Sequence, residues 1–279
     1  MKKHAIFISA DRKFFEILKI CLSSIQRYYP QHPEIIVCHT DFLWSDQQML
    51  QETCTNIIFI SNTLSQNEIW PIMSHLTDVD PRVFYARFML WKEKIFTPYD
   101  TILHLDADIL VLQDLSALFE EDEFFMVQEA YKWNDQIFKN FDDFDLKQKL
   151  YENNISVKNI AGNAGVFLLP KKCRTQKHYQ ELMNILFVYQ NDIKWADQSV
   201  INIWAYKYNF KLSENYDYNF QHRILIDGNM TMDQIKIVHF NGIDAKYRIS
   251  CMQYFLYLYE NDCSVVKYRD FYNELIQYG

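Results

Sequence analysis

The sequence predicts an α/β protein with a mostly parallel sheet. Short apolar runs of strand length recur at residues 4–9, 34–40, 56–61 and 101–106. Apolar residues at helical spacing lie between several of these runs, most clearly from Phe14 to Tyr29. Strands that alternate with helices are typical of βαβ units, whose sheets are parallel. A chain of 279 residues with 49% hydrophobic residues is long enough for one large domain or two small ones.

After the first three strands, the sequence predicts a helix, a strand and a short helix. The helix covers residues 82–96, with Pro81 near its first turn. The strand over 101–106 is apolar until it reaches an aspartate, Asp106. A short helix over 115–119 follows, and Asp114 is expected to be its N-cap.

The second half continues the alternation after a polar insertion. Residues 130–160 are rich in Asn, Asp and aromatic residues, and insertions of this kind often contact substrates. Beyond them, the sequence predicts strands at 163–170 and 235–242 and helices at 173–192 and 196–209. We expect a single domain over 1–250 that includes the insertion, with a helical, aromatic tail at 251–279 packed on it.

Composition excludes several classes of partner and location. The net charge is −8 and lysine and arginine form no local run, so a nucleic-acid partner is not expected. The six cysteines are scattered without a C-x-x-C pair, which favours free thiols in a reducing cytosol. The first apolar run is too short for a signal peptide, and none reaches the about 18 residues of a membrane span. We expect a cytoplasmic protein, with peripheral membrane attachment as the alternative.

The aspartate pair Asp106 and Asp108 is the strongest chemical signal. In an extended backbone, residues two apart point the same way, so the two carboxylates can face one spot. Such neighbours repel each other unless a proton or a cation lies between them. The alternative is a surface turn, in which D-x-D is common. Because the pair directly follows an apolar strand, where open α/β sheets bind ligands, we favour a divalent metal site.

His239 is the candidate third ligand. It lies at the end of the predicted strand 235–242, and it would join Asp106 and Asp108 if the two strands end side by side. Oxygen and imidazole ligands suit Mn²⁺ better than Mg²⁺ or Ca²⁺, and the remaining coordination positions would accept a diphosphate. The alternative is an ordinary core or surface histidine.

Other polar residues beside apolar runs have both a structural and a functional interpretation. Gly242 would let the backbone approach a phosphate, and Lys246 would supply a charge, although most lysines are solvated surface residues. Arg87 has the same two interpretations. Three more residues, expected in turns or caps when taken singly, are Asn163, Asp197 and Gln198.

Four motifs, in this order along the chain, resemble glycosyltransferase family 8. They are the segments FYARFMLWKEKIFTPYDTILHLDADILVLQDLSALF, GNAGVFLLP, WADQSVINI and VHFNGIDAK. The similarity runs from Ile6 to about Lys246, which is most of the chain. An ordered set of this kind is far more specific than a D-x-D pair alone.

The resemblance implies a GT-A fold, in which a Rossmann-like nucleotide-binding half is fused to an acceptor-binding half. It also implies retaining transfer of a hexose, glucose or galactose foremost, from a UDP-sugar to a saccharide or glycoconjugate hydroxyl. Mn²⁺ is the expected ion, with Mg²⁺ as the alternative. The residues that match are Asp106, Asp108 and His239 for the metal; Ser9, Asp11 and Lys13 for the uridine; Ala107, Arg87, Gly242 and Lys246 for the ribose and diphosphate; and Asn163, Asp197 and Gln198 for the donor sugar.

The sequence departs from the family pattern after Gly242. Three residues, 243–245, separate this glycine from Lys246, where the family usually has two. Tyr247 and Arg248 replace the Pro-Trp that commonly follows the lysine. Arg248 is therefore a second candidate for the cation at the diphosphate.

The expected mechanism is attack by the acceptor hydroxyl on the face from which UDP departs. A double displacement needs a carboxylate nucleophile, whereas the matching position holds the amide Gln198. Two other classes of protein share part of this pattern. Phosphatases of the haloacid dehalogenase type also use strand-D-x-D, but near the N-terminus. The other alternative is a nucleotide-sugar or glycan-binding protein of the same fold that has lost turnover.

Overall fold

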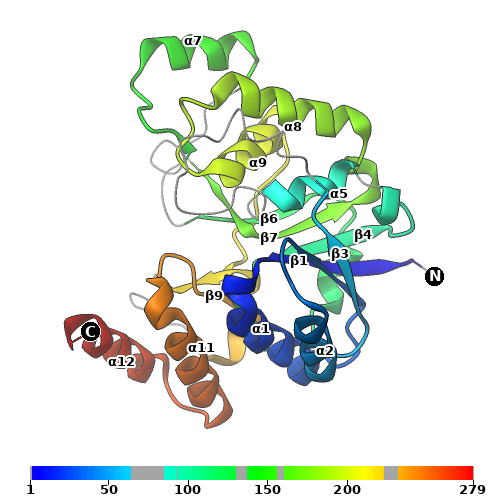
Figure 1. Ribbon diagram of the computed structural model, residues 1–279. Helices are drawn as coiled ribbons and strands as arrows, with labels where there is room; N and C mark the ends of the chain where they lie inside the picture. Colours follow the sequence, from blue (N-terminus) through cyan, green and yellow to red (C-terminus); the bar gives the residue numbers. More distant parts are fainter. Residues whose placement is uncertain are drawn as a thin grey trace.

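A six-stranded sheet forms the centre of the molecule (Figure 1). The structure, a computed structural model, describes residues 2–63, 85–92, 94–129, 137–155, 160–222 and 232–278. In spatial order the strands are β3 (Ile57–Ser61), β2 (Glu34–His39), β1 (His4–Ala10), β4 (Thr101–Leu105), β7 (Gly162–Pro170) and β6 (Phe125–Gln128). The first four strands are parallel, β7 is antiparallel to β4, and β6 is antiparallel to β7. The predicted mostly parallel α/β sheet is confirmed.

A second, smaller sheet is formed by three strands that follow β4 in the sequence. It contains β5 (Ile109–Val111), β9 (Ile237–His239) and β8 (Phe220–Gln221), in that order. β5 and β9 are antiparallel, whereas β8 and β9 are parallel. The segment that follows β4 is thereby held against the strand that ends in His239.

Helices cover both faces of the central sheet and complete two hydrophobic cores (Figure 1). Side chains alternate along β1, so Ile6 and Ile8 face one core and Phe7 faces the other. The helices on the Ile6 side are α1 (Phe15–Tyr28), α2 (Trp44–Thr53), α11 (Ala245–Glu260) and α12 (Val265–Tyr278). Those on the Phe7 side are α5 (Met89–Lys92), α7 (Phe144–Glu152), α8 (Gln176–Tyr189) and α9 (Ala196–Lys207).

The helix predicted over 82–96 has a different form. Its first residues, 82–84, and Pro81 lie outside the described residues. The described part consists of a 3-10 turn (Ala86–Phe88), the single turn of α5 and another 3-10 turn (Lys94–Phe96). All residues from Tyr85 to Trp91 are buried, so packing on every side, and not one amphipathic face, determines this conformation.

Other segments agree with the sequence more closely. The short helix predicted at 115–119 is a 3-10 helix, Ser116–Glu120. Leu115 occupies its N-cap position, while the Asp114 carboxylate accepts a hydrogen bond from Ser116 N at 2.7 Å. The insertion contains α7, and its residues 130–136 and 156–159 lie outside the described part. The strands β6 and β8 and the helix α2 were not predicted.

All six cysteines are free, as the sequence predicted. Within the described residues, no helix has both the length and the apolar character that are needed to cross a membrane.

Candidate functional site

Three side chains from separate elements converge at the C-terminal end of β4. Asp106 follows β4 directly, Asp108 precedes β5, and His239 ends β9. Pairing of β5 with β9 places Ile109 opposite His239, and Phe240 N donates to Asp108 O at 2.9 Å. Each of the three side chains offers one possible ligand atom, and these atoms all lie within 4.8 Å of one another. This set of two carboxylates and one imidazole fits a divalent cation.

The His239 imidazole presents one nitrogen to the carboxylates and the other to two amides. Nε2 lies 3.3 Å from Asp108 Oδ1 and 3.7 Å from Asp106 Oδ2. Nδ1 lies 3.1 Å from Asn163 Oδ1 and 3.2 Å from Asn219 Oδ1, so Nδ1–H donates to these oxygens. Burial alone would lower the pKa of His239, but the Asp108 and Asp106 carboxylates outweigh it and raise this pKa above its ordinary value. Nε2 is therefore the nitrogen that either a proton or a metal can occupy.

Gly165 makes room for this imidazole. A Cβ atom added at Gly165 would lie 2.1 Å from Cε1 of His239, far inside van der Waals contact. The backbone of Gly165 also fixes the first aspartate, because its carbonyl accepts a hydrogen bond from Asp106 N at 2.8 Å. The strand β7 thus contributes to the site by close approach of its backbone.

A buried arginine links Asp106 to Asp197. Arg87 Nη2 lies 2.8 Å from Asp106 Oδ1, Nε lies 2.8 Å from Asp197 Oδ2, and Nη1 donates to Ala164 O at 2.8 Å. Burial opposes ionisation of Asp106, but Arg87 and His104 hold its pKa well below its usual range. Burial raises the pKa of Asp197 to about 6, with the Arg87 guanidinium acting in the opposite direction. The two carboxylates beside Arg87 therefore have different proton affinities.

The loop after β9 brings an arginine, and not the predicted lysine, to the carboxylates. Gly242 has a φ of 73°, a left-handed conformation that favours glycine and turns the chain into α11. Lys246 is exposed, with Nζ 4.4 Å from the centre of the Tyr247 ring. Arg248 is largely buried, with Nη1 3.4 Å from Asp108 Oδ2.

Comparison with known families identifies the chain. The model of the family described as Glycosyl transferase family 8 matches residues 5–247. The chain belongs to glycosyltransferase family 8. The sequence matches none of the curated proteins with which it was compared.

Solved structures show the same fold at low sequence identity. The galactosyltransferase LgtC, in complex with donor and acceptor sugar analogues, has a TM-score of 0.64 and 16% identity over 92% of this chain and 95% of its own. The glycosyltransferase GlyE of Streptococcus pneumoniae TIGR4, in its apo form, has a TM-score of 0.57 and 18% identity, over 95% of this chain and 65% of its own. Mouse xyloside xylosyltransferase 1 has a TM-score of 0.54 and 14% identity, over 87% and 98%. The predicted GT-A fold is confirmed.

The residues predicted for the nucleotide lie along the same edge of the family 8 sheet. β1 runs beside β4 with Ile8 opposite Leu105, so the residues after Ile8 lie next to the aspartate pair. Asp11 is buried and caps a 3-10 helix by accepting from Phe14 N at 3.2 Å. Around it lie buried Ser9, exposed Lys13 and, on the aspartate loop, buried Ala107.

Of the residues predicted for the donor sugar, Asn163 contacts His239, while Asp197 and Gln198 lie at the start of α9. Asn163 Nδ2 donates to Glu129 Oε2 at 2.8 Å, in addition to its contact with the imidazole. Gln198 Oε1 accepts from Ala164 N at 3.1 Å. Asp197, at the start of the same helix, is joined to Arg87 as described above.

Sequence reasoning missed two buried residues next to the site. His104 lies two residues before Asp106 in β4, and its period-two spacing with Asp106 and Asp108 was a signal that could have found it. Asn219 donates from Nδ2 to Asn163 Oδ1 at 3.0 Å and contacts His239. No motif in the sequence marks Asn219.

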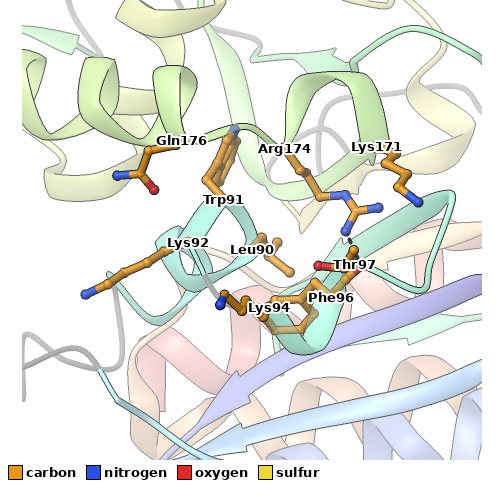
Figure 2. A pocket seen from close by; sticks show the side chains of 9 residues that line it. All are labelled: Leu90, Trp91, Lys92, Lys94, Phe96, Thr97, Lys171, Arg174 and Gln176. Carbon is orange, nitrogen blue, oxygen red and sulfur yellow. Dashed lines mark hydrogen bonds between the residues drawn. The ribbon is translucent and has the colours of Figure 1, made fainter.

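A basic pocket lies at the opposite end of β4 from the aspartates. Thr101, the first residue of β4, pairs with Pro170, the last residue of β7, and the pocket opens beside this end. Figure 2 shows Trp91 and Phe96 on its wall together with its four cationic side chains, Lys92, Lys94, Lys171 and Arg174. It is separate from the convergence of Asp106, Asp108 and His239.

Proposed function

We propose that this protein is a metal-dependent, retaining hexosyltransferase that uses a UDP-sugar donor. The observation that carries the proposal is the convergence of Asp106, Asp108 and His239 at the C-terminal end of β4, where sheets of this architecture bind nucleotides. The proposed acceptor is a hydroxyl of a saccharide or glycoconjugate. Glucose and galactose are the proposed sugars, and LgtC, whose fold the chain shares, is a galactosyltransferase.

We propose that residues around the aspartate pair bind UDP, the leaving group of the reaction. Bound Mn²⁺, or Mg²⁺ as the alternative, would supply positive charge that stabilises departing UDP. Asp106, Asp108 and His239 would hold this ion. Ser9, Asp11, Lys13 and Ala107 would surround the nucleoside, and Gly242 would let the loop after β9 close over the diphosphate.

Arg248 is the better candidate for the protein cation at the diphosphate. Its guanidinium already contacts Asp108, and its Nη2 donates to Ile243 O at 2.8 Å, which fixes it beside the loop. Lys246 is exposed and would have to leave the Tyr247 ring to reach the same place. A planar guanidinium also suits phosphate oxygens geometrically.

Attack by the acceptor on the face from which UDP departs agrees with the contacts of the residues proposed to surround the donor sugar. Gln198 and Asp197 stand around the proposed donor sugar, with Asn163 contributing by holding His239. The Gln198 amide is a poor nucleophile, and the Asp197 carboxylate is engaged by Arg87. The acceptor hydroxyl would therefore attack the anomeric carbon directly, while the departing phosphate takes the hydroxyl proton. Asp197 would stabilise positive charge on the sugar ring.

We propose one catalytic domain over 1–250, an acceptor-side insertion at 130–160 and a tail at 251–279. A cytoplasmic location would match the reduced cysteines.

A panel of UDP-sugars tests the function directly. We expect release of UDP from one hexose donor when Mn²⁺ is present and none when it is chelated. Asp108→Asn should abolish this release while leaving the unfolding curve in the absence of metal close to that of the wild type. Undiminished turnover in this variant, or the same rate without any divalent ion, would exclude the proposed metal site.

A binding protein of the same fold is the second candidate. The exposed position of Lys246 is the observation that favours it, because turnover would be impaired if Arg248 did not replace this lysine at the diphosphate. This candidate predicts that a UDP-sugar binds but that no UDP is released with any acceptor or with water.

A further inference from the structure

His104 is a buried polar residue inside β4, a strand whose five residues are all buried. Its neighbours Leu103 and Leu105 belong to one hydrophobic core, whereas His104 points to the opposite face with 0% exposure. Its ring stacks on Phe167, with centroids 4.7 Å apart and an interplanar angle of 28°. A phenylalanine would fill such a space without desolvating two ring nitrogens, so core packing does not explain the histidine.

The polar contact of this imidazole goes to Asp106. Nε2 lies 3.1 Å from Asp106 Oδ1, and Nδ1 is buried without a hydrogen-bond partner among the described residues. Because Asp106 Oδ1 can only accept, Nε2 carries the hydrogen and Nδ1 carries the lone pair. One ring nitrogen is thus left unsatisfied in order to direct the other at the carboxylate.

This hydrogen bond acts on one particular oxygen of Asp106. Oδ1 receives both His104 Nε2 and Arg87 Nη2, the latter at 2.8 Å. Oδ2, which receives neither, lies 3.7 Å from His239 Nε2 and faces the other ligand candidates. The two donors therefore fix the rotation of the carboxylate and point Oδ2 at the site.

We propose that His104 is a positioning residue that holds Asp106 in the orientation needed to bind the divalent cation. The inference rests on the proposed metal-dependent function and extends it by a residue that does not itself bind the ion. Fixing the carboxylate in advance removes an entropic cost from metal binding. The same hydrogen bond leaves Nδ1 unpaired, so it improves the site at some expense to the stability of the fold.

A pair of substitutions of similar shape separates the hydrogen bond from packing. His104→Gln can donate from its amide nitrogen near the position of Nε2, whereas His104→Met has almost the same length and no donor. His104→Phe keeps a flat ring against Phe167 and also removes the donor. His178→Phe is the control, because His178 is a partly buried histidine that accepts from Trp204 Nε1 at 3.2 Å, far from the metal candidates in sequence.

The measurement is Mn²⁺ affinity, followed by the electron paramagnetic resonance signal of the free ion, with no sugar or nucleotide present. We expect His104→Phe and His104→Met to weaken Mn²⁺ binding by about tenfold, the lower end of the range for partners of metal ligands. His104→Gln should retain affinity within about threefold, because the donor is restored. His178→Phe should bind Mn²⁺ like the wild type.

Urea unfolding without metal provides the second readout. His104→Phe should be at least as resistant as the wild type, whereas His178→Phe should be less resistant, because it loses its hydrogen bond to Trp204. If His104→Phe does not fold, the Gln and Met pair still decides the question.

The outcomes distinguish this inference from the function on which it rests. Wild-type affinity in the Phe or Met variant would overturn the positioning role while leaving the metal site intact. Equal weakening in the Gln and Met variants would also overturn it, because the donor would then make no difference. A wild-type protein that binds no Mn²⁺ or Mg²⁺ would overturn the metal-dependent function and this inference together.

Discussion

At the scale of single residues, two carboxylates of the site differ in pKa because different side chains surround them. Asp106 and Asp197 both contact Arg87, yet the pKa of Asp106 is held low and burial raises the pKa of Asp197 to about 6. The difference arises because Arg87, His104 and His239 together outweigh burial at Asp106, whereas burial outweighs Arg87 and the backbone hydrogen bonds at Asp197. Each carboxylate is thereby suited to a different task.

The raised pKa of Asp197 predicts a specific dependence of stability on pH. The folded-state pKa of about 6 exceeds the ordinary value of 3.8, so the folded protein binds the proton more tightly. The contribution of this group to stability is therefore present at low pH and is lost as the pH rises through 6. Two pKa units correspond to roughly 3 kcal/mol in the free energy of unfolding.

Asp197→Asn should remove this dependence. Urea unfolding of wild type and variant at several pH values between 4 and 7 measures it, and subtracting the two curves cancels the other titrating groups. We expect the wild type to lose roughly 2.5 kcal/mol relative to the variant across this interval, because the unfolded aspartate is already about half ionised at pH 4. Parallel curves would show that Asp197 titrates normally.

Gly165 should be intolerant of even one methyl group. In Gly165→Ala, Cβ would overlap the His239 ring, so we expect a loss of about 1–3 kcal/mol in the free energy of unfolding and markedly weaker Mn²⁺ binding. Gly162→Ala is the matched control, since its Cβ would lie 2.3 Å from the terminal methyl of Met126, which can rotate away. Equal effects on Mn²⁺ affinity in the two variants would contradict the role assigned to Gly165.

At the scale of elements, strand pairing and the start of a helix assemble the site. Antiparallel pairing of β5 with β9 brings His239 beside Asp108, although the two are far apart in sequence. The helix α11 begins at Ala245, earlier than the predicted tail, because Asp244 caps it by accepting from Lys246 N at 3.1 Å. Helical geometry then turns Lys246 and Arg248 in different directions, since residues two apart do not share a face.

The direction of these two side chains predicts which one binds the diphosphate. With Mn²⁺ present, Arg248→Ala should weaken UDP binding by about tenfold or more, the usual value of a hydrogen bond to a charged group. Lys246→Ala, two residues away on the same helix, should change it by less than about twofold. Isothermal titration with UDP measures both constants. A larger loss of UDP affinity in Lys246→Ala than in Arg248→Ala would show that Lys246 binds the diphosphate.

At the scale of the whole molecule, two cores hold the sheet so that its C-terminal edge meets the second sheet. Residues that alternate along β1 and β4 anchor helices on both faces, which fixes the two strand ends relative to each other. The candidate ligands come from segments far apart in the sequence, the turn between β4 and β5 and the end of β9, and meet only when both sheets have formed. Binding of ligands at this junction should therefore stabilise the entire fold.

Thermal unfolding with ligands tests this linkage. With Mn²⁺ present throughout, UDP at about a hundred times its dissociation constant should add about 2.7 kcal/mol to the free energy of unfolding and raise Tm by roughly 5 °C. Asp108→Asn should show little of this rise, and chelation should reverse it in the wild type. An equal rise in the variant would place the binding elsewhere.

The sequence alone determined the parts of this protein that depend on local pattern. Apolar runs and helical spacing located the main strands and helices, and the ordered motifs placed the chain in its family. The pattern failed in the described part of 82–96, because Tyr85 to Trp91 are all buried and packing, not periodicity, sets their conformation. It also could not detect β8, whose two residues leave no periodic signal.

Tertiary structure alone decided which side chains meet. Period two predicted that Asp106 and Asp108 share a direction, but the register between β5 and β9 was needed to bring His239 within 3.3 Å of Asp108. The ranking of Arg248 over Lys246 depended on where α11 begins. The His104 contact with Asp106 required knowledge of which strand face is buried and what lies across it. Contacts between distant segments depend on register and on helix starts, and a single sequence does not encode these as local patterns.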